Sequence, residues 1–300
     1  MDRRLNKYKN NKVPATTAAQ ARSSFFIPTI KNKKNENKRE FLIKIKNNEY
    51  KVKEMGIILT ELHKDIIDAI FIAKRKHKET ETGYQMLYNL TDVYNIMNKR
   101  ISRVELKNKI QEIRTTTFFL QNPADTFQYY DFNIFSKNKI TNMEYGKGKG
   151  FNKNKINYYY LVEISKEYLL FEYLDIQIYL NDKTLKEIIN IKSAIVKHLI
   201  RYCLSQNKLN KDLLDIMNEI NIVNQNMTRQ YINKCKQEIL KHKDILLNKF
   251  NIEIKIIEKT GRHGIFYTKN DNIYFKNDEK IGIEYKTEEL NGQPNILINE

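Results

Sequence analysis

The sequence TRQYINKCKQEILKHK at residues 228–243, followed by NIEIKIIEK at 251–259 and IFYTKN at 265–270, decides the fold prediction. The first stretch carries apolar residues at helical spacing after Thr228, a residue type that caps helices, and predicts an amphipathic helix. The two later stretches alternate apolar and polar residues around the turn TGRHG, and predict a β-hairpin. A helix followed by a hairpin is typical of a winged helix, which is a helix-turn-helix with a β wing.

Two further helices are predicted upstream of this one. The sequence LKEIINIKSAIVKHLIRYCLSQN at 185–207 predicts one long helix, and KDLLDIMNEI at 211–220 predicts a second, capped by Asn210. The three helices and the hairpin together give the complete order of elements of a winged helix.

The same order is predicted in the first half of the chain. The sequence TELHKDIIDAIFIAKRKHK at 60–78 predicts a helix, and Thr91 caps a second one. The capping box from Ser102 to Glu105 starts a third helix, which ends near Arg114. Strand-like sequence follows in TTTFFL, FQYYDFNIF and INYYYLVEIS. The predicted fold class is therefore α+β, with two tandem winged-helix domains.

The charge divides the chain further. The 300 residues include 53 Lys and Arg against 36 Asp and Glu, a net charge of +17 that favours a polyanionic partner. We predict four regions: a basic, largely flexible N-terminal arm at 1–54, the two winged helices at 55–180 and 181–276, and an acidic tail at 277–300. Within the arm, Phe25-Phe26-Ile27 is expected to dock on the body or on a partner. The alternative is that an A+T-rich genome enriches lysine and that the charge is only solvated.

The third helix of a winged helix enters the major groove, so its exposed face should carry donors for phosphates and base edges. In the second domain the candidates for contact with double-stranded DNA are Thr228, Arg229, Gln230, Asn233, Lys234, Gln237 and Lys241. In the first domain they are Arg103, Lys107 and Arg114, for which phosphate contact is expected rather than base readout. The alternative for both helices is an ordinary amphipathic helix with a solvated polar face.

Two loops add candidates for phosphate contact. Lys147 and Lys149 alternate with glycines in the first domain, without the spacing of a nucleotide-binding loop, and Arg262 lies in the turn of the second hairpin. A solvated hairpin tip is the alternative for the lysine loop.

Enzymatic signals are weak, and we expect no catalytic residue, cofactor or metal. The five histidines form neither a His-x-His nor a His-Glu-x-x-His pair, and the two cysteines, Cys203 and Cys235, lack metal-ligand spacing. The sequence contains no uncharged apolar run of 18 residues, so a membrane-spanning helix is not expected, and we predict a cytoplasmic protein.

The order of these segments resembles plasmid replication initiators of the Rep superfamily, in particular the replication initiator protein A or TrfA-like group. The resemblance covers about residues 55–270 and rests on degenerate pieces such as LTELHKDIIDAI and YNLTDVYNIMNKRISRVELKNKIQEI. It implies binding to direct repeats (iterons) at an origin, opening of adjacent A+T-rich DNA, and recruitment of a host initiator and the replicative helicase. It also implies a monomer in equilibrium with a homodimer formed largely through the first domain. The alternatives are a two-domain transcriptional regulator and, from another class, a nicking or priming enzyme.

Overall fold

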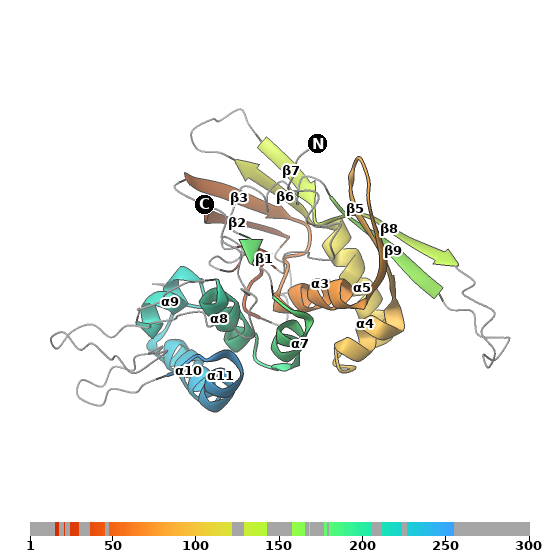
Figure 1. The fold of residues 1–300 in the computed structure, drawn as a ribbon. Coiled ribbons are helices and arrows are strands. Elements are labelled where there is room, and N and C mark those ends of the chain that lie inside the picture. Colours follow the sequence, from red (N-terminus) through yellow and green to blue (C-terminus); the bar gives the residue numbers. More distant parts are fainter. Residues whose placement is uncertain are drawn as a thin grey trace, which may run out of the picture. The chain divides into compact units, whose positions relative to one another are not determined.

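A computed structural model describes most of the two predicted domains (Figure 1). The described residues are 16–17, 21, 25–29, 37–45, 48–121, 129–142, 158–165, 168, 177–178, 180–205, 212–223 and 227–254. The chain divides into two compact units. The first unit consists of residues 1–13, 32–42 and 48–174, and the second consists of residues 14–31, 43–47 and 175–300.

Three helices form the centre of the first unit. They are α3 (Glu61–Ala73), α4 (Leu90–Ile96) and α5 (Arg103–Thr115). The prediction that Thr91 caps the second helix is wrong, because Asn89 is the cap and its Oδ1 accepts the backbone N–H of Thr91 at 2.7 Å. Helix α3 packs against both α4 and α5. Its apolar core positions, including Ile66 and Ile70, are completely buried, as the helical spacing of the sequence predicts.

One four-stranded antiparallel sheet of the first unit has the order β2-β3-β6-β7. Its strands are β2 (Lys38–Ile45), β3 (Asn48–Met55), β6 (Thr117–Gln121) and β7 (Tyr129–Asn133). Gly56, just after β3, has φ +108°, and a Cβ there would lie 3.2 Å from the carbonyl oxygen of Thr115, so this turn requires glycine. Residues 38–54 were predicted to belong to the basic arm, but they form two strands of this sheet.

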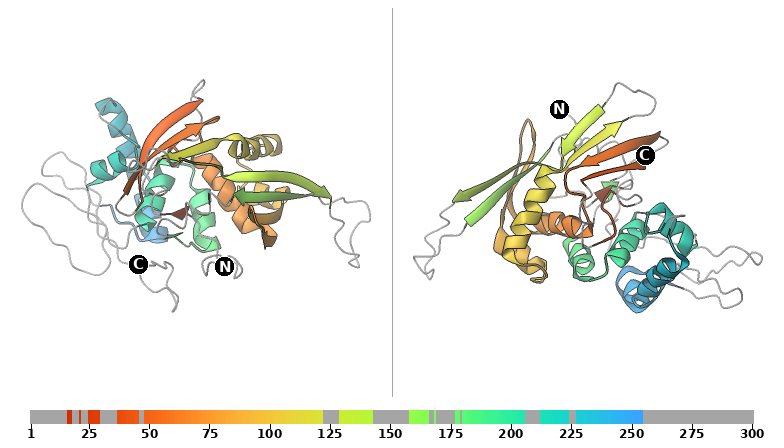
Figure 2. Two further views of the ribbon diagram at one scale, coloured as in Figure 1. Left: turned by 90° about the horizontal axis from the view of Figure 1, so that it is seen from above. Right: turned by 180° about the vertical axis from the view of Figure 1, so that it is seen from behind.

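The second four-stranded antiparallel sheet of this unit has the order β4-β5-β9-β8. Its strands are β4 (Lys74–Glu79), β5 (Gly83–Asn89), β9 (Tyr158–Ser165) and β8 (Phe135–Asn142). Helices α3 and α4 pack against β5, and α5 packs against β8. Figure 2 shows the β8–β9 hairpin projecting past these helices. This hairpin is the wing of the first unit, where the strand-like sequence predicted one.

Strand β4 differs from the sequence prediction, in which the preceding helix continues through residue 78. The helix ends at Ala73, and the sequence KRKHKE pairs with β5 as an edge strand. The pairing shifts register between Lys74 and Lys76, which marks a β-bulge around Arg75. The side chain of Arg75 donates hydrogen bonds of 3.1 and 2.6 Å to Asp92 at the start of α4. Lys and Arg have good helix propensity, so the local sequence favours a helix here. The non-local pairing with β5 makes the segment a strand instead.

The second unit contains five described helices. They are α7 (Asp182–Asn190), α8 (Ala194–Leu204), α9 (Leu213–Glu219), α10 (Arg229–Leu240) and α11 (Lys243–Phe250). The single helix predicted over 185–207 is two helices, because the hydroxyl of Ser193 accepts the backbone N–H of Val196 and starts a new one. The predicted cap Asn210 lies outside the described residues, and Asp212 caps α9.

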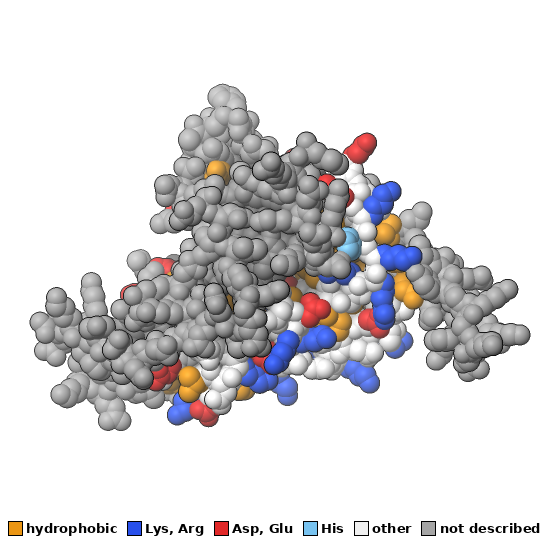
Figure 3. All heavy atoms as spheres, in the orientation of Figure 1, with side chains coloured by type: hydrophobic (Ala, Val, Ile, Leu, Met, Phe, Trp, Pro, Cys, Tyr) orange, Lys and Arg blue, Asp and Glu red, His pale blue; other side chains and the backbone are white. Residues whose placement is uncertain are grey.

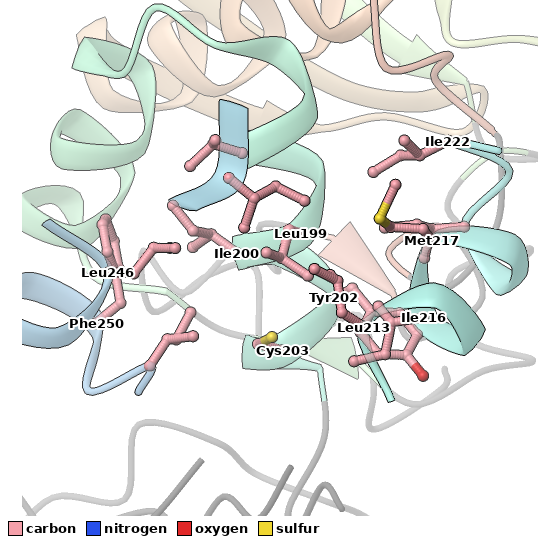
Figure 4. Packing of buried hydrophobic residues seen from close by; sticks show 14 of the residues in the cluster. Leu199, Ile200, Tyr202, Cys203, Leu213, Ile216, Met217, Ile222, Leu246 and Phe250 are labelled. Carbon is pink, nitrogen blue, oxygen red and sulfur yellow. The ribbon is translucent and has the colours of Figure 1, made fainter. Parts of the chain in front are cut away.

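Helices α8 to α11 share one hydrophobic core (Figure 4). Leu199, Cys203 and Ile216 are completely buried in it, together with Ile239 of α10. Burial raises the pKa of the Cys203 thiol to about 12, so this cysteine is an apolar core residue at neutral pH. The hairpin predicted to follow α11 lies beyond residue 254, outside the described part of the chain.

A segment near the N-terminus also groups with the second unit. Strand β1 (Thr16–Thr17) pairs antiparallel with β10 (Gln177–Ile178). Phe25 and Phe26 follow, with 0% and 3% of their surfaces exposed and ring centroids 5.3 Å apart. These aromatic residues are buried, as expected for residues that dock on the body of the protein. The described residues have the predicted α+β class, consistent with winged-helix-like units.

Candidate nucleic-acid interface

Both units contain the same helix-turn-helix arrangement. In each, a short helix (α4 or α9) is followed by a turn with an asparagine in the left-handed region, Asn98 at φ 50° and Asn221 at φ 53°. A longer helix then begins at a hydroxyl cap: Ser102 Oγ accepts the backbone N–H of Glu105 at 3.0 Å, and Thr228 Oγ1 accepts that of Tyr231 at 3.3 Å. Asparagine adopts the left-handed conformation of these turns at low energetic cost. Helices α5 and α10, which follow these turns, are therefore the helices that the sequence predicted as the third of each winged helix, and they begin at the predicted N-caps.

Helix α10 separates its apolar and polar residues as the sequence indicated. Cys235 and Ile239 are buried against the core. All seven candidates of this helix are exposed to solvent: Thr228, Arg229, Gln230, Asn233, Lys234, Gln237 and Lys241. Asn233 and Gln237 are one turn apart and share a face. Within the described part of the chain, the side chains of Asn233, Lys234 and Gln237 make no hydrogen bond or ion pair, so they are available to a ligand.

The N-terminus of α10 favours an anion. Its first turn contains no acidic residue, and Arg229 occupies the first helical position. The unpaired N–H groups and the helix dipole add positive potential at the same end. This combination suits contact with a phosphate, while the asparagine and glutamine amides further along can pair with the edge of adenine.

Helix α5 presents a second exposed polar face. Arg103, Lys107 and Arg114 are all exposed, and their spacings correspond to about one and about two helical turns. Glu105, however, lies in the first turn of this helix and is also exposed. Its negative charge opposes phosphate binding at the helix N-terminus, which distinguishes α5 from α10.

Two contacts fix α5 in the first unit. The guanidinium of Arg103 lies 5.2 Å from the ring centroid of Tyr94 in α4, a cation–π contact that limits the freedom of this side chain. On the buried side, His63 Nε2 lies 2.9 Å from Glu112 Oε2. The backbone N–H of Thr60 donates to His63 Nδ1 at 2.9 Å, so the remaining proton of the neutral ring belongs on Nε2 and is donated to Glu112.

Burial lowers the pKa of His63, although the hydrogen bond to Glu112 acts in the opposite direction. Burial also raises the pKa of Glu112, but the hydrogen bonds from His63 and Lys109 outweigh this effect and lower it. The pair is thus a neutral imidazole and a carboxylate, which join the first helix to the third.

Three candidates from sequence are not among the described residues, and two exposed residues of the helices were not assigned from sequence. Lys147, Lys149 and Arg262 lie outside the described residues. Conversely, two exposed apolar side chains stand among the polar ones, Val104 on α5 with 69% of its surface exposed and Tyr231 on α10 with 42%. Apolar side chains in a major groove can contact the thymine methyl group. Neither residue is a candidate from sequence, because single exposed apolar residues cannot be recognised before their burial is known.

No cluster of three His, Cys, Asp or Glu side chains among the described residues could hold a metal ion. None of the described helices is both long enough and apolar enough to cross a bilayer.

The comparison with solved structures finds a similar fold. The crystal structure of selenomethionine derivatives of domains 2 and 3 of RctB superposes with a TM-score of 0.56 and 13% identity, over 84% of this chain and 96% of that chain. Another crystal structure of RctB domains 2–3 matches with a TM-score of 0.49 and 13% identity, over 79% and 87% of the two chains. No protein-family model matches the sequence, and no curated protein matches it. At this identity the likeness shows the fold alone.

Proposed function

We propose that this protein is a replication initiator that binds specific sequences of double-stranded DNA and acts without enzymatic chemistry. The exposed face of α10 carries this proposal, because it places Asn233 and Gln237 one turn apart behind an acid-free, arginine-bearing N-terminus. The two amides can read adenine edges, and the helix N-terminus can hold the phosphate that sets the register. Double-stranded DNA is therefore the partner that this face fits.

The similarity in fold supports the initiator role. RctB is a replication initiator, and its domains 2 and 3 superpose on 84% of this chain with a TM-score of 0.56. In line with the resemblance noted in the sequence, we further propose that the target is a set of direct repeats at an origin. Opening of adjacent A+T-rich DNA, recruitment of a host initiator and helicase, and a monomer–dimer equilibrium belong to the same proposal. Assignment to the replication initiator protein A or TrfA-like group stays a prediction.

The test is a titration of the full-length protein with a repeat-containing duplex and a random duplex of equal length. Fluorescence anisotropy at several salt concentrations gives the association constants. We expect tighter binding to the repeats, with a log–log salt slope on the order of −5 to −10, because several phosphate contacts release counterions. A slope near zero, or equal affinity for both duplexes, contradicts the proposal.

A further inference from the structure

Helix α5 carries three uncharged residues at the centre of its exposed face, which are not among the phosphate contacts expected of this helix. They are Val104, Asn108 and Gln111, and all three are exposed. On the side of the described residues that Figure 3 shows, Lys and Arg side chains are interspersed with acidic and uncharged ones. Charge alone therefore does not distinguish the surfaces on this side, whereas uncharged groups of defined chemistry can.

The helical period divides α5 into a buried side, an uncharged centre and a basic flank. The buried side consists of three apolar residues, Leu106, Ile110 and Ile113. At about 100° per residue, the three uncharged residues lie roughly opposite this buried side and within about 60° of one another. The cations predicted to contact phosphates lie together on one flank of the uncharged centre: Arg103, Lys107 and Arg114.

The uncharged centre of α5 corresponds to the face of α10 that is proposed to read bases. Gln111 and Gln237 both lie nine positions after the N-cap of their helix. Asn108 and Asn233 lie six and five positions after the same caps. Each helix follows the turn of a helix-turn-helix, so equal distances from the cap place the two glutamines at the same level along the two third helices.

Helix stability does not explain why Val104 and Asn108 occupy this face. Valine and asparagine are weaker helix formers than lysine, glutamate or alanine, and both residues are exposed, where packing does not select them. Val104 is the most exposed large apolar side chain in the described part of the chain, at 69%. Contact with a ligand gives these residue types a role that the fold itself does not.

The polar side chains of this face can reach a ligand, while the helix that carries them is fixed. Within the described residues, the side chain of Asn108 makes no hydrogen bond, and that of Gln111 accepts one long bond of 3.5 Å from Arg114. Away from this face, Glu112 contacts His63 of α3 at 2.9 Å. This contact and the buried apolar side set the rotation of α5 about its axis, so the uncharged centre points to solvent.

We propose that α5 reads base edges in the major groove through Val104, Asn108 and Gln111, and that its target contains A·T base pairs. Asparagine and glutamine pair bidentately with adenine, and an apolar side chain contacts the thymine methyl group. The basic flank keeps its predicted contacts with phosphates. The inference rests on the proposed function, since it assumes that duplex DNA is the ligand, and it makes the first unit a second source of sequence preference beside α10.

The experiment tests each protein group against the base group that it is proposed to contact. The wild type and V104A are titrated with the repeat-containing duplex, in which each thymine is replaced in turn by deoxyuridine, which lacks only the methyl group. N108A and Q111A are titrated with the repeat-containing and random duplexes. L42A and N248A remove an exposed leucine of β2 and an exposed asparagine of α11, and are the matched controls. Anisotropy gives the affinities, and thermal unfolding checks that each variant is folded.

At one thymine, we expect replacement by deoxyuridine to weaken wild-type binding by about threefold to fivefold, because the apolar contact of one methyl group is lost. The same replacement should leave the affinity of V104A unchanged, since the shortened side chain no longer reaches that methyl group. N108A and Q111A should each weaken binding to the repeat by roughly tenfold and change binding to the random duplex by less than about twofold. L42A and N248A should bind as the wild type does.

Equal weakening of the repeat and random duplexes in N108A and Q111A overturns the inference, because it assigns these side chains to the DNA backbone. A deoxyuridine effect of the same size in V104A and the wild type at every thymine also overturns it. So do wild-type affinities of V104A, N108A and Q111A, which would make the face a solvated one. Alanine has better helix propensity than the residues it replaces, so the variants are expected to fold. Equal affinity of the wild type for both duplexes would instead remove the proposed function itself.

Discussion

His63 is a buried residue of the first unit whose protonation state affects two hydrogen bonds. Its ring accepts the backbone N–H of Thr60 at the start of α3 and donates to Glu112 of α5. A second proton would face the Thr60 N–H and end that hydrogen bond. The neutral ring therefore stabilises both the helix start and the position of the third helix.

The sign of the resulting pH dependence follows from the lowered pKa of His63. In the unfolded chain the imidazole titrates near 6.5, above its pKa in the folded protein, so the unfolded state binds more protons below this pH. We expect the free energy of unfolding to be fully present above about pH 6.5 and to decrease as the pH falls toward the folded pKa. Denaturant unfolding of the protein between pH 5 and 7.5 measures this.

Two variants separate the effect of protonating His63 from the effect of losing its hydrogen bonds. His63→Gln keeps an acceptor for the Thr60 N–H, in the manner of a capping box, and should show a flatter pH dependence over this window. His63→Leu leaves the Thr60 N–H and Glu112 without this partner and should lose about 1–3 kcal/mol at neutral pH. A wild-type pH dependence in His63→Gln would assign the effect to another group.

At the scale of single residues, the sequence predicted the caps Ser102 and Thr228 and the exposed donors of α10, but it missed the cap Asn89 and every buried polar pair. Ser102 and Thr228 are caps because a hydroxyl before an amphipathic run acts locally. His63 and Glu112 lie 49 positions apart. No local pattern of the sequence connects them, so their pairing cannot be predicted from the sequence alone.

At the scale of elements, helix α10 and strand β4 show the same difference between structure set by the local sequence and structure set by distant residues. The exposed face of α10 follows from the 3.6-residue period of its own sequence. Strand β4 depends on its partner β5, and the bulge at Arg75 depends on Asp92 of another element. The same reason explains why strands β2 and β3 were missed, since β3 is held by residues of β6 far along the chain.

The element that reads bases can be identified by substitution. Asn233→Ala or Gln237→Ala should lower affinity for the repeat by about 1–3 kcal/mol and relax preference at one base pair, because a bidentate contact is lost. Lys107→Ala on α5 should weaken repeat and random duplexes alike. Asn248→Ala, at an exposed position of α11, is the matched control.

Anisotropy with single-base variants of the repeat measures these preferences. If Lys107→Ala reduces the ratio of repeat to random affinity and the α10 variants do not, the reading helix lies in the first unit. Circular dichroism shows whether each variant keeps its helices.

At the scale of the whole molecule, the N-terminal region is more than a source of charge. We expect deletion of residues 1–31 to destabilise the second unit, because it removes β1 together with the buried rings of Phe25 and Phe26. Burial of two such side chains corresponds to roughly 3–6 kcal/mol. Denaturant unfolding of this deletion, beside one that lacks residues 1–13, measures the loss.

The variant F25A/F26A keeps every lysine and provides the control. It should unfold more easily than the wild type while its salt slope for DNA is unchanged. Wild-type stability in F25A/F26A would mean that the segment contributes charge alone, as the prediction of a flexible arm supposed.

The pairing of Thr16 with Ile178 also has a consequence for synthesis of the protein. A ribosome makes β1 long before β10, and at about 5–20 residues per second the interval is roughly 10–30 s. During that time the Phe25-Phe26 pair has left the ribosome while the part of the second unit that includes β10 does not yet exist. Strand β1 therefore stays without its partner strand while the first unit is completed, and the pair β1–β10 can form only after that.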